Sequence, residues 1–285
     1  QVANAMDDII VTARRREESL QSVPVAITAV SGQMLADFRI DSVDSLERLE
    51  PSLSVSPASG RPNSPVYALR GVRPTESIYG QDPTVAVYLA DVVQSPAQGS
   101  NLGFYDLENV QVLKGPQGTL FGRNTVAGAI LLTPRKPGKE FAGNAMIGMG
   151  SYGLVEGEFG LDIPLAETFQ IRLAGRAVEG GDYQRNVVTG YEGPAGSTPG
   201  TWIEDPSNIN PLNGTRLGGQ GIRSIRATLA GQFTPDISNT LIISYDENDN
   251  NGRSMILEAV NPAIPNYDPK VPDAPNLWPQ RLLDL

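Results

Sequence analysis

A lysine next to several glycines is the first feature of this sequence that could bind a ligand. Lys114 is followed by Gly115, Pro116, Gly118 and Gly122, and the backbone N–H groups of such residues can surround a phosphate. A nucleotide-binding P-loop requires the order GxxxxGK, with Ser or Thr at the start of a helix. Here the lysine precedes the glycines and no long amphipathic helix pattern follows. The sequence therefore predicts a compact turn instead of a nucleotide site.

Two further motifs begin like ligand sites but fail on their context. Residues 148–153 match GxGxxG, yet the residues that follow alternate with a period of two, which predicts a strand where a dinucleotide site needs a helix. Asp246 opens a stretch that starts like a calcium-binding loop. Asn251 stands where that loop needs glycine, and Leu257 occupies the place of the bidentate glutamate. Neither motif predicts a cofactor or metal site.

The composition narrows the possible functions. The chain of 285 residues has no Cys and no His, and 22 Lys plus Arg against 32 Asp plus Glu give a net charge of −10. Without imidazoles or thiols, the commonest general bases and transition-metal ligands are missing, so any enzyme would have to rely on carboxylates, Lys, Tyr or Ser alone. We assign no catalytic residue and no metal ligand. The negative charge excludes nucleic acid as a partner. The longest apolar runs fall well short of the roughly 20 residues of a membrane-spanning helix, whereas membrane β-strands remain possible.

The elements that would position these residues fall into two groups, of which the first is a small mixed α/β region. β-Favouring residues flank the glycines in 110–137, which predicts a strand, a tight connection and a second strand. Residues 52–65 are rich in Ser, Pro and Gly and are expected to form a loop. Three more strands are predicted at 24–30, 66–72 and 84–93.

Two short helices are also predicted in this first region. One follows Ser31, with Met34, Leu35 and Phe38 on a shared face. The other is capped by Asp41 or Ser42, carries an apolar stripe up to Leu49 and stops at Pro51.

After residue 137 the pattern changes to strict alternation of apolar and polar residues. Each such segment is about eight to ten residues long, the length of a tilted membrane strand, and its polar face carries charges such as Arg172 and Arg176. The connections 164–168 and 235–240 are short, whereas 179–223 is long, an asymmetry typical of outer-membrane barrels. Five segments share the alternation: 143–150, 154–163, 169–177, 224–233 and 241–248.

Residues 110–137 resemble the plug-domain signature of TonB-dependent outer-membrane receptors. Ala127 and Leu131 depart from the family's usual Gly and Asn, which affects local packing in a hydrophobic strand end. The positions that match are Gly115, Pro116, Gln117, Gly118, Thr119, Leu120, Gly122, Arg123, Asn124, Gly128, Ala129, Ile130, Lys136 and Pro137.

Two shorter stretches add to the resemblance. Leu69, Arg70 and Gly71 are similar to the family's LRG. Residues 88–92 are similar to its YxDGV, with Ala90 and Asp91 in place of the usual Asp and Gly. Because Asp adopts a positive φ less readily than Gly, a different turn is expected there.

The resemblance implies a TonB box near the N-terminus. An apolar triplet flanked by charges suits a segment that pairs as an added strand with another chain; the alternative is a first strand or a frayed end. The residues expected to bind TonB are Asp8, Ile9, Ile10, Val11, Thr12 and Ala13.

Other site residues follow from the same resemblance. Arg70 and Arg123 are expected to contact the barrel wall, where the family has acidic partners, although plain surface arginines are the alternative. For substrate contact, the candidates are the loop positions Arg61, Asn63, Tyr79 and Gln81.

The predicted fold class is mainly β, with a small α+β plug inside a transmembrane antiparallel β-barrel. The resemblance implies about 22 barrel strands, of which only about five lie in this chain. We expect a flexible N-terminus with the TonB box at 1–22, the plug at 23–137 and the first part of the barrel at 138–285. Because five strands leave two unpaired edges in lipid, the chain is expected to be the N-terminal portion of a longer receptor.

The implied function is TonB-dependent active transport of a scarce solute, a ferric siderophore or another nutrient, across the bacterial outer membrane, with the plug gating the barrel. The expected partners are TonB and its inner-membrane energising complex, the small solute or metal chelate, the lipid bilayer and lipopolysaccharide. No cofactor is expected. A soluble secreted carbohydrate-binding or hydrolytic β-protein is the alternative from another class, and a passive porin or adhesin would need no plug. Receptors for siderophores, cobalamin, saccharides and peptides share these motifs, so the solute stays open.

Overall fold

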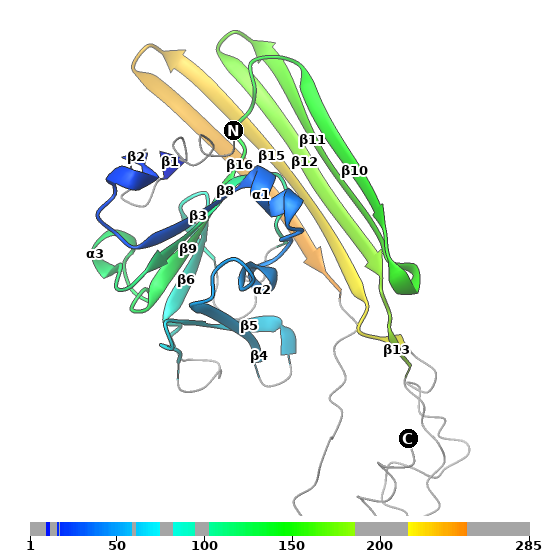
Figure 1. The fold of residues 1–285 in the computed structure, drawn as a ribbon. Helices are drawn as coiled ribbons and strands as arrows, with labels where there is room; N and C mark the ends of the chain where they lie inside the picture. The colour runs from blue at the N-terminus through cyan, green and yellow to red at the C-terminus, as the bar shows by residue number, and fades with distance from the viewer. Residues whose placement is uncertain are drawn as a thin grey trace, which may run out of the picture. The chain divides into compact units, whose positions relative to one another are not determined.

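The computed structural model describes residues 10–11, 16, 18–58, 61–74, 82–94, 103–185 and 216–249. Their helices and strands form a mixed N-terminal region, drawn in blue to green in Figure 1, and a later sheet of long strands, drawn in green to orange. We refer to the second as the long-stranded sheet. Within the described residues, no helix has both the length and the apolar character needed to cross a membrane.

A five-stranded sheet forms the centre of the N-terminal region, with the order β3-β8-β9-β6-β7. The predicted pair of strands around the glycines is confirmed: β8 and β9 are antiparallel, with the short helix α3 (Gly118–Phe121) in their connection. On its other side, β9 pairs in parallel with β6, and β7 follows β6 at the edge of the sheet. The strand bounds are β3 Ile27–Ser31, β6 Val85–Leu89, β7 Val92–Val93, β8 Leu107–Lys114 and β9 Gly128–Pro134.

Both faces of this sheet are buried, because successive residues of its central strand pack into different clusters. Ile130 and Leu132 belong to the cluster that includes Leu35 and Leu46 of the two helices before β4, whereas Ala129 and Leu131 belong to a second cluster. A strand covered on both sides needs an unbroken apolar run, and β9 has one.

Two short helices begin at the predicted caps. The Ser31 hydroxyl accepts a hydrogen bond from the Met34 amide at the start of α1 (Gly32–Asp37). Ser42 and Ser45 form a capping box at α2 (Val43–Leu46). The prediction of a shared apolar face is wrong at Phe38, which follows the end of α1 and is 54% exposed.

The expected loop at 52–65 is wrong, since β4 (Leu53–Ala58) and β5 (Arg61–Leu69) pair as an antiparallel hairpin. Its Ser and Pro content is typical of loops, yet apolar residues at every second position bury one side. Leu53 and Leu69, which face each other in the register, are both buried. The two remaining strands of this region are short, β1 (Ile10–Val11) and β2 (Glu18–Ser19), and precede a 3-10 turn at Leu20–Ser22.

The hairpin between β6 and β7 corrects the expectation of an altered turn. Leu89 pairs with Val92, so only Ala90 and Asp91 form the loop, with φ of 48° and 65°. Two-residue hairpin loops with positive φ at both positions match the right-handed twist of the strands. The hairpin therefore keeps the left-handed turn even though neither residue is a glycine.

The long-stranded sheet has the order β10-β11-β12-β15-β16, antiparallel throughout, which confirms that the five predicted segments are strands. The expected length of eight to ten residues is wrong for all but β10, since the other four strands have 12 or 15 residues. Tight turns of two residues join β11 to β12 and β15 to β16. The GxGxxG motif leads through a short 3-10 turn at Ser151–Gly153 into β11, a strand, as predicted. The bounds are β10 Ala142–Met149, β11 Val155–Ala166, β12 Phe169–Gly180, β15 Gln220–Thr234 and β16 Ile237–Asn248; β13 (Gln184–Arg185) pairs with β14 (Arg216–Leu217).

The two faces of the long-stranded sheet differ in chemistry. Odd-numbered apolar residues such as Phe159, Ile225 and Ile243 are exposed on one face. On the other face, several even-numbered polar residues of β12 and β15 are buried, among them Arg172 and Thr228, which are direct partners in the register. The predicted alternation is therefore confirmed in the orientation of the side chains.

Candidate functional site

Three arginines on the polar face of the long-stranded sheet form the centre of the candidate site. Arg172 and Arg176 come from β12, and Arg226 comes from β15 opposite Ala174, between them. Their exposed fractions are only 4%, 6% and 4%. A buried guanidinium requires hydrogen-bonding and charged partners. The N-terminal region and β11 supply carboxylates to Arg172 and Arg176, whereas the Nε of Arg226 has no hydrogen-bond partner among the described residues.

Arg172 binds two carboxylates at once. Its Nε donates to Asp106 Oδ2 at 2.8 Å and its Nη2 lies 2.5 Å from Asp106 Oδ1, a bidentate pair. Its Nη1 lies 2.6 Å from Oδ2 of Asp162, the residue directly opposite on β11. Asp162 Oδ1 also accepts a hydrogen bond from the Gly138 amide at 2.9 Å.

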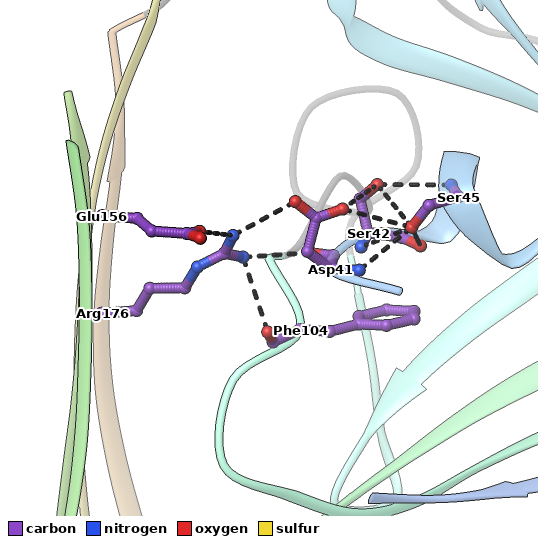
Figure 2. Close-up of polar contacts among 6 residues, drawn as sticks. All are labelled: Asp41, Ser42, Ser45, Phe104, Glu156 and Arg176. Atoms are coloured by element: carbon purple, nitrogen blue, oxygen red, sulfur yellow. Dashed lines mark hydrogen bonds and ion pairs between the residues drawn. The ribbon is translucent and has the colours of Figure 1, made fainter. Parts of the chain in front are cut away.

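Arg176 makes a similar pair of contacts (Figure 2). Its Nη2 lies 3.2 Å from Asp41 Oδ2 and 3.7 Å from Glu156 Oε2 on β11. Its Nη1 donates to the Asp41 carbonyl at 3.1 Å and to the Phe104 carbonyl at 3.5 Å. The other carboxylate oxygen of Asp41, Oδ1, accepts from the hydroxyls of Ser42 and Ser45 at the cap of α2.

Arg226 completes the site at Tyr105. Its Nη1 donates to the Tyr105 carbonyl at 3.4 Å, and its guanidinium lies 4.3 Å from the centroid of the Tyr105 ring, a cation–π contact. Among the described residues, the buried Tyr105 hydroxyl has no hydrogen-bond partner. Burial, partly offset by Arg226, raises the pKa of Tyr105 to about 12, so this side chain is neutral at physiological pH.

Phe104, Tyr105 and Asp106 are thus each held by a different side chain of the long-stranded sheet, and we call them the anchor segment. The Asp106 amide also donates to Glu158 Oε1 at 3.1 Å, and Asp106 itself has a positive φ of 50°. The anchor segment is joined to Asp41 by the hydrogen bond from the Phe104 amide to the Asp41 carbonyl, 2.8 Å. The site is therefore one connected ionic contact between two regions of the chain.

The sequence pointed to the two β12 arginines as part of a charged face, but it did not indicate their partners. Asp106 lies 66 positions from Arg172, and Asp41 lies 135 positions from Arg176. The sequence indicated Asp41 only as a possible helix cap, Asp106 belonged to no recognised motif, and no local pattern in the sequence connects residues so far apart.

A second buried ion pair lies within the N-terminal region and explains the lysine beside the glycines. Lys114 Nζ lies 2.8 Å from Glu50 Oε2, and the Ser52 hydroxyl and amide donate to Glu50 Oε1 at 2.5 and 3.1 Å. Burial on its own would raise the pKa of Glu50, but the hydrogen bonds from Lys114, Ser52 and Thr28 outweigh it and lower the pKa to about 2. Lys114 therefore forms a structural ion pair with Glu50 inside the N-terminal region.

Two of the residues expected to bind TonB lie in the described part of the chain. Ile10 and Val11 form β1, which pairs with β2. Val11 is 0% exposed and packs in the cluster that contains Val23, Leu113 and Phe121. The other residues of the predicted box lie outside the described residues: Asp8, Ile9, Thr12 and Ala13.

The arginines expected to contact the wall, Arg70 and Arg123, are both exposed, and neither forms an ion pair with a described residue. Their role as wall contacts stays a prediction. Arg61 and Asn63 were expected in a loop but lie in β5, and their side chains fall outside the described residues. Tyr79 and Gln81 also lie outside the described residues.

Comparison with known proteins relates these regions to a family. Residues 19–129 match the family model of the TonB-dependent receptor plug domain. The chain is 30% identical over 183 residues to the ferripyoverdine receptor of Pseudomonas aeruginosa, a match that covers 64% of this chain and 22% of that receptor. It is 26% identical over 174 residues to a vitamin B12 transporter of Vibrio vulnificus, covering 59% of this chain and 27% of that transporter.

A solved structure has the same fold. The pyoverdine outer-membrane receptor of Pseudomonas aeruginosa, bound to pyoverdine, aligns with a TM-score of 0.62 at 19% identity, over 84% of this chain and 30% of that receptor. The chain thus spans between a fifth and a third of these relatives' lengths. The plug match and the long antiparallel strands that follow it lead to one assignment: residues 19–129 are a plug domain of the TonB-dependent receptor family.

Proposed function

We propose that the receptor to which this chain belongs actively transports a scarce solute, a ferric siderophore or another nutrient, across the bacterial outer membrane, with the plug gating the barrel. The observation that carries this proposal is the match of residues 19–129 to the plug domain. Relatives named for ferripyoverdine and vitamin B12 support a solute of this kind. Family membership speaks against the soluble secreted β-protein and against a passive porin, which needs no plug.

The proposed organisation has three parts: an N-terminus with the TonB box at 1–22, the plug at 23–137 and the start of the barrel at 138–285. The plug match and the first long strand, β10 at Ala142–Met149, support the second boundary. We refer below to the N-terminal region as the plug and to the long-stranded sheet as the barrel wall.

The burial of Val11 suggests how TonB would act on the plug. TonB would pair with the box as an added strand, which requires free backbone N–H and C=O groups. In the structure Ile10 and Val11 of this segment are already paired with Ser19 and Glu18, and the Val11 side chain is inside the plug core. Solute occupancy would release the segment to periplasmic TonB, and force from the inner-membrane energising complex would then displace the plug.

The remaining partners follow from the same proposal. The solute or metal chelate would bind above the plug, and lipid with lipopolysaccharide would surround the apolar face of the barrel wall. We propose no catalytic role and no cofactor, because transport by plug displacement needs no covalent chemistry.

Deletion of residues 8–13 in the full receptor tests this function. A growth panel of iron and carbon sources with a deletion strain first identifies the solute. We then expect the deletion to abolish energised uptake of the labelled solute while binding to whole cells is unchanged. Ile10→Pro, which removes a backbone N–H, should act like the deletion, and Ile10→Val should not. Uptake at the unaltered rate in the deletion variant would contradict the role of the box.

A further inference from the structure

Each of the two β12 arginines is shared between the plug and the barrel wall in the same way. Arg172 lies between Asp106 of the plug and Asp162 of the wall, at 2.5 and 2.6 Å. Arg176 lies between Asp41 of the plug and Glu156 of the wall, at 3.2 and 3.7 Å (Figure 2). Both arginines are therefore within reach of a carboxylate that stays on the wall when the plug moves.

We propose that Asp162 and Glu156 are standby acceptors, which keep these arginines paired while the plug is displaced. This inference rests on the proposed function in one respect, since transport requires the plug to move. Its physical basis does not depend on the solute or on TonB.

The cost of separating the plug from the wall depends on what happens to the buried cations. The side chains of Arg172 and Asp106 are 5% and 4% exposed, and a buried charge that loses its only partner is strongly destabilised. In the docked state Asp106 and Asp162 also repel each other across the same guanidinium. The wall carboxylate thus stabilises Arg172 more after the plug has left than before, which lowers the cost of release.

The charges of the wall itself fit this interpretation. Its arginines at this contact are Arg172, Arg176 and Arg226, and its own carboxylates beside them are Asp162, Glu156 and Glu158. Asp246, in the same cross-strand row as Arg176 and Ser224, adds a fourth carboxylate to this face. The wall carboxylates therefore outnumber the three arginines, and the wall needs no plug carboxylate to balance its positive charge. The acids of the plug are additional, and the plug can leave without exposing an excess of positive charge.

The two shared arginines differ in how firmly they hold the plug. Asp106 is almost fully buried and bound through both oxygens, whereas the Asp41 side chain is 50% exposed and its Oδ1 is already engaged by the Ser42 and Ser45 hydroxyls. Solvent and the serines can replace Arg176 at Asp41 (Figure 2). The Asp41 contact should therefore open before the contact at the anchor segment.

Hydrogen exchange of the full-length receptor in detergent micelles tests the proposal without a solute. The readout is the exchange rate of the amides in residues 103–107, corrected for the intrinsic rate of each variant. Asp106→Asn removes the negative charge of the plug carboxylate and should speed exchange about tenfold. Asp162→Asn removes the negative charge of the standby carboxylate, keeps an oxygen for the Gly138 amide, and should slow exchange several-fold. Faster or unchanged exchange in Asp162→Asn would overturn the proposal.

A second pair of variants tests the same proposal at Arg176, so that misfolding of one variant at Arg172 does not decide the result. Glu156→Gln should slow exchange of residues 41–46, and Asp41→Asn should speed it. Heat-modifiable gel mobility checks that each barrel is folded. Once the solute is known, Asp162→Asn should also transport it more slowly at unchanged surface binding. The exchange result stands whether or not the receptor transports, so a failure of the standby role is distinguishable from a failure of the proposed function.

Discussion

At the scale of single residues, the buried pair of Glu50 and Lys114 shows how one ionic contact can stabilise the plug. Lys114 ends β8, just before the glycine-rich connection, and Glu50 follows α2 and precedes β4. The pair therefore ties the central sheet to the hairpin of β4 and β5. Removing one partner of a buried pair leaves an uncompensated charge, which is costly.

Glu50→Gln should destabilise the plug at neutral pH. The pKa of Glu50 is lowered from 4.5 to about 2 in the folded protein, which corresponds to up to about 3 kcal/mol. Because the folded pKa is the lower one, this stability is present above about pH 4.5 and is lost as the pH falls towards 2. Native-state hydrogen exchange of residues 44–58 in the full receptor measures it.

The exposed residue Glu108 on β8 provides the matched control. Glu108→Gln should leave the exchange of residues 44–58 unchanged at every pH. Equal protection in Glu50→Gln and the unaltered receptor at pH 7 would show that the pair contributes nothing to stability.

At the scale of secondary-structure elements, the hairpin of β6 and β7 carries local strain. Ala90 and Asp91 both have positive φ, a conformation that costs residues other than glycine roughly 1 kcal/mol each. The pairing of Leu89 with Val92 requires a loop of this length and twist. The pairing of β6 with β7 therefore keeps Ala90 and Asp91 in this strained conformation.

Asp91→Gly should stabilise this hairpin, by about 0.5 to 1 kcal/mol once the entropy of glycine in the unfolded chain is counted. Slower hydrogen exchange of residues 85–94 in the full receptor is the expected result. Asp82→Gly, at a nearby exposed position outside the left-handed region, should bring no gain. If Asp91→Gly also leaves the exchange rate unchanged, the turn is not strained.

At the scale of the whole molecule, the two faces of the barrel wall have different surroundings. The polar face is buried by the plug contact along β12 and β15, whereas Ile225, Ile243 and Tyr245 are more than half exposed on the other face. Long antiparallel strands with an apolar outer face suit the hydrocarbon layer of a membrane. The plug and the wall are thus held together on one side by ion pairs, and we propose that lipid covers the apolar face of the wall on the other side.

Ile243→Lys should destabilise the full receptor refolded into lipid vesicles by about 2 to 4 kcal/mol, because a lysine near the bilayer midplane loses its hydration. Urea titration followed by gel mobility measures the loss. Thr240→Lys, on the other face of the same strand, should cost little. Equal costs for both variants would mean that the odd-numbered face does not meet lipid.

The sequence alone determined the features that depend on nearby residues. The period-two alternation indicated the five long strands, because each face of a strand meets one kind of surroundings. Ser31 and Ser42 indicated the helix starts, because a cap binds amides only two or three residues away. The plug signature around Gly115 indicated the family for the same local reason, since a glycine-rich connection is encoded by adjacent residues.

Only the tertiary structure decided the features that depend on distant residues. Asp106 pairs with Arg172 over a separation of 66 positions, and the hairpin of β4 and β5 forms from Ser- and Pro-rich residues because Leu53 and Leu69 reach the plug core. The turn at Ala90 is left-handed because the strands on both sides are paired. In each case the free energy comes from contacts made after the chain has folded back on itself, and no short stretch of sequence contains them.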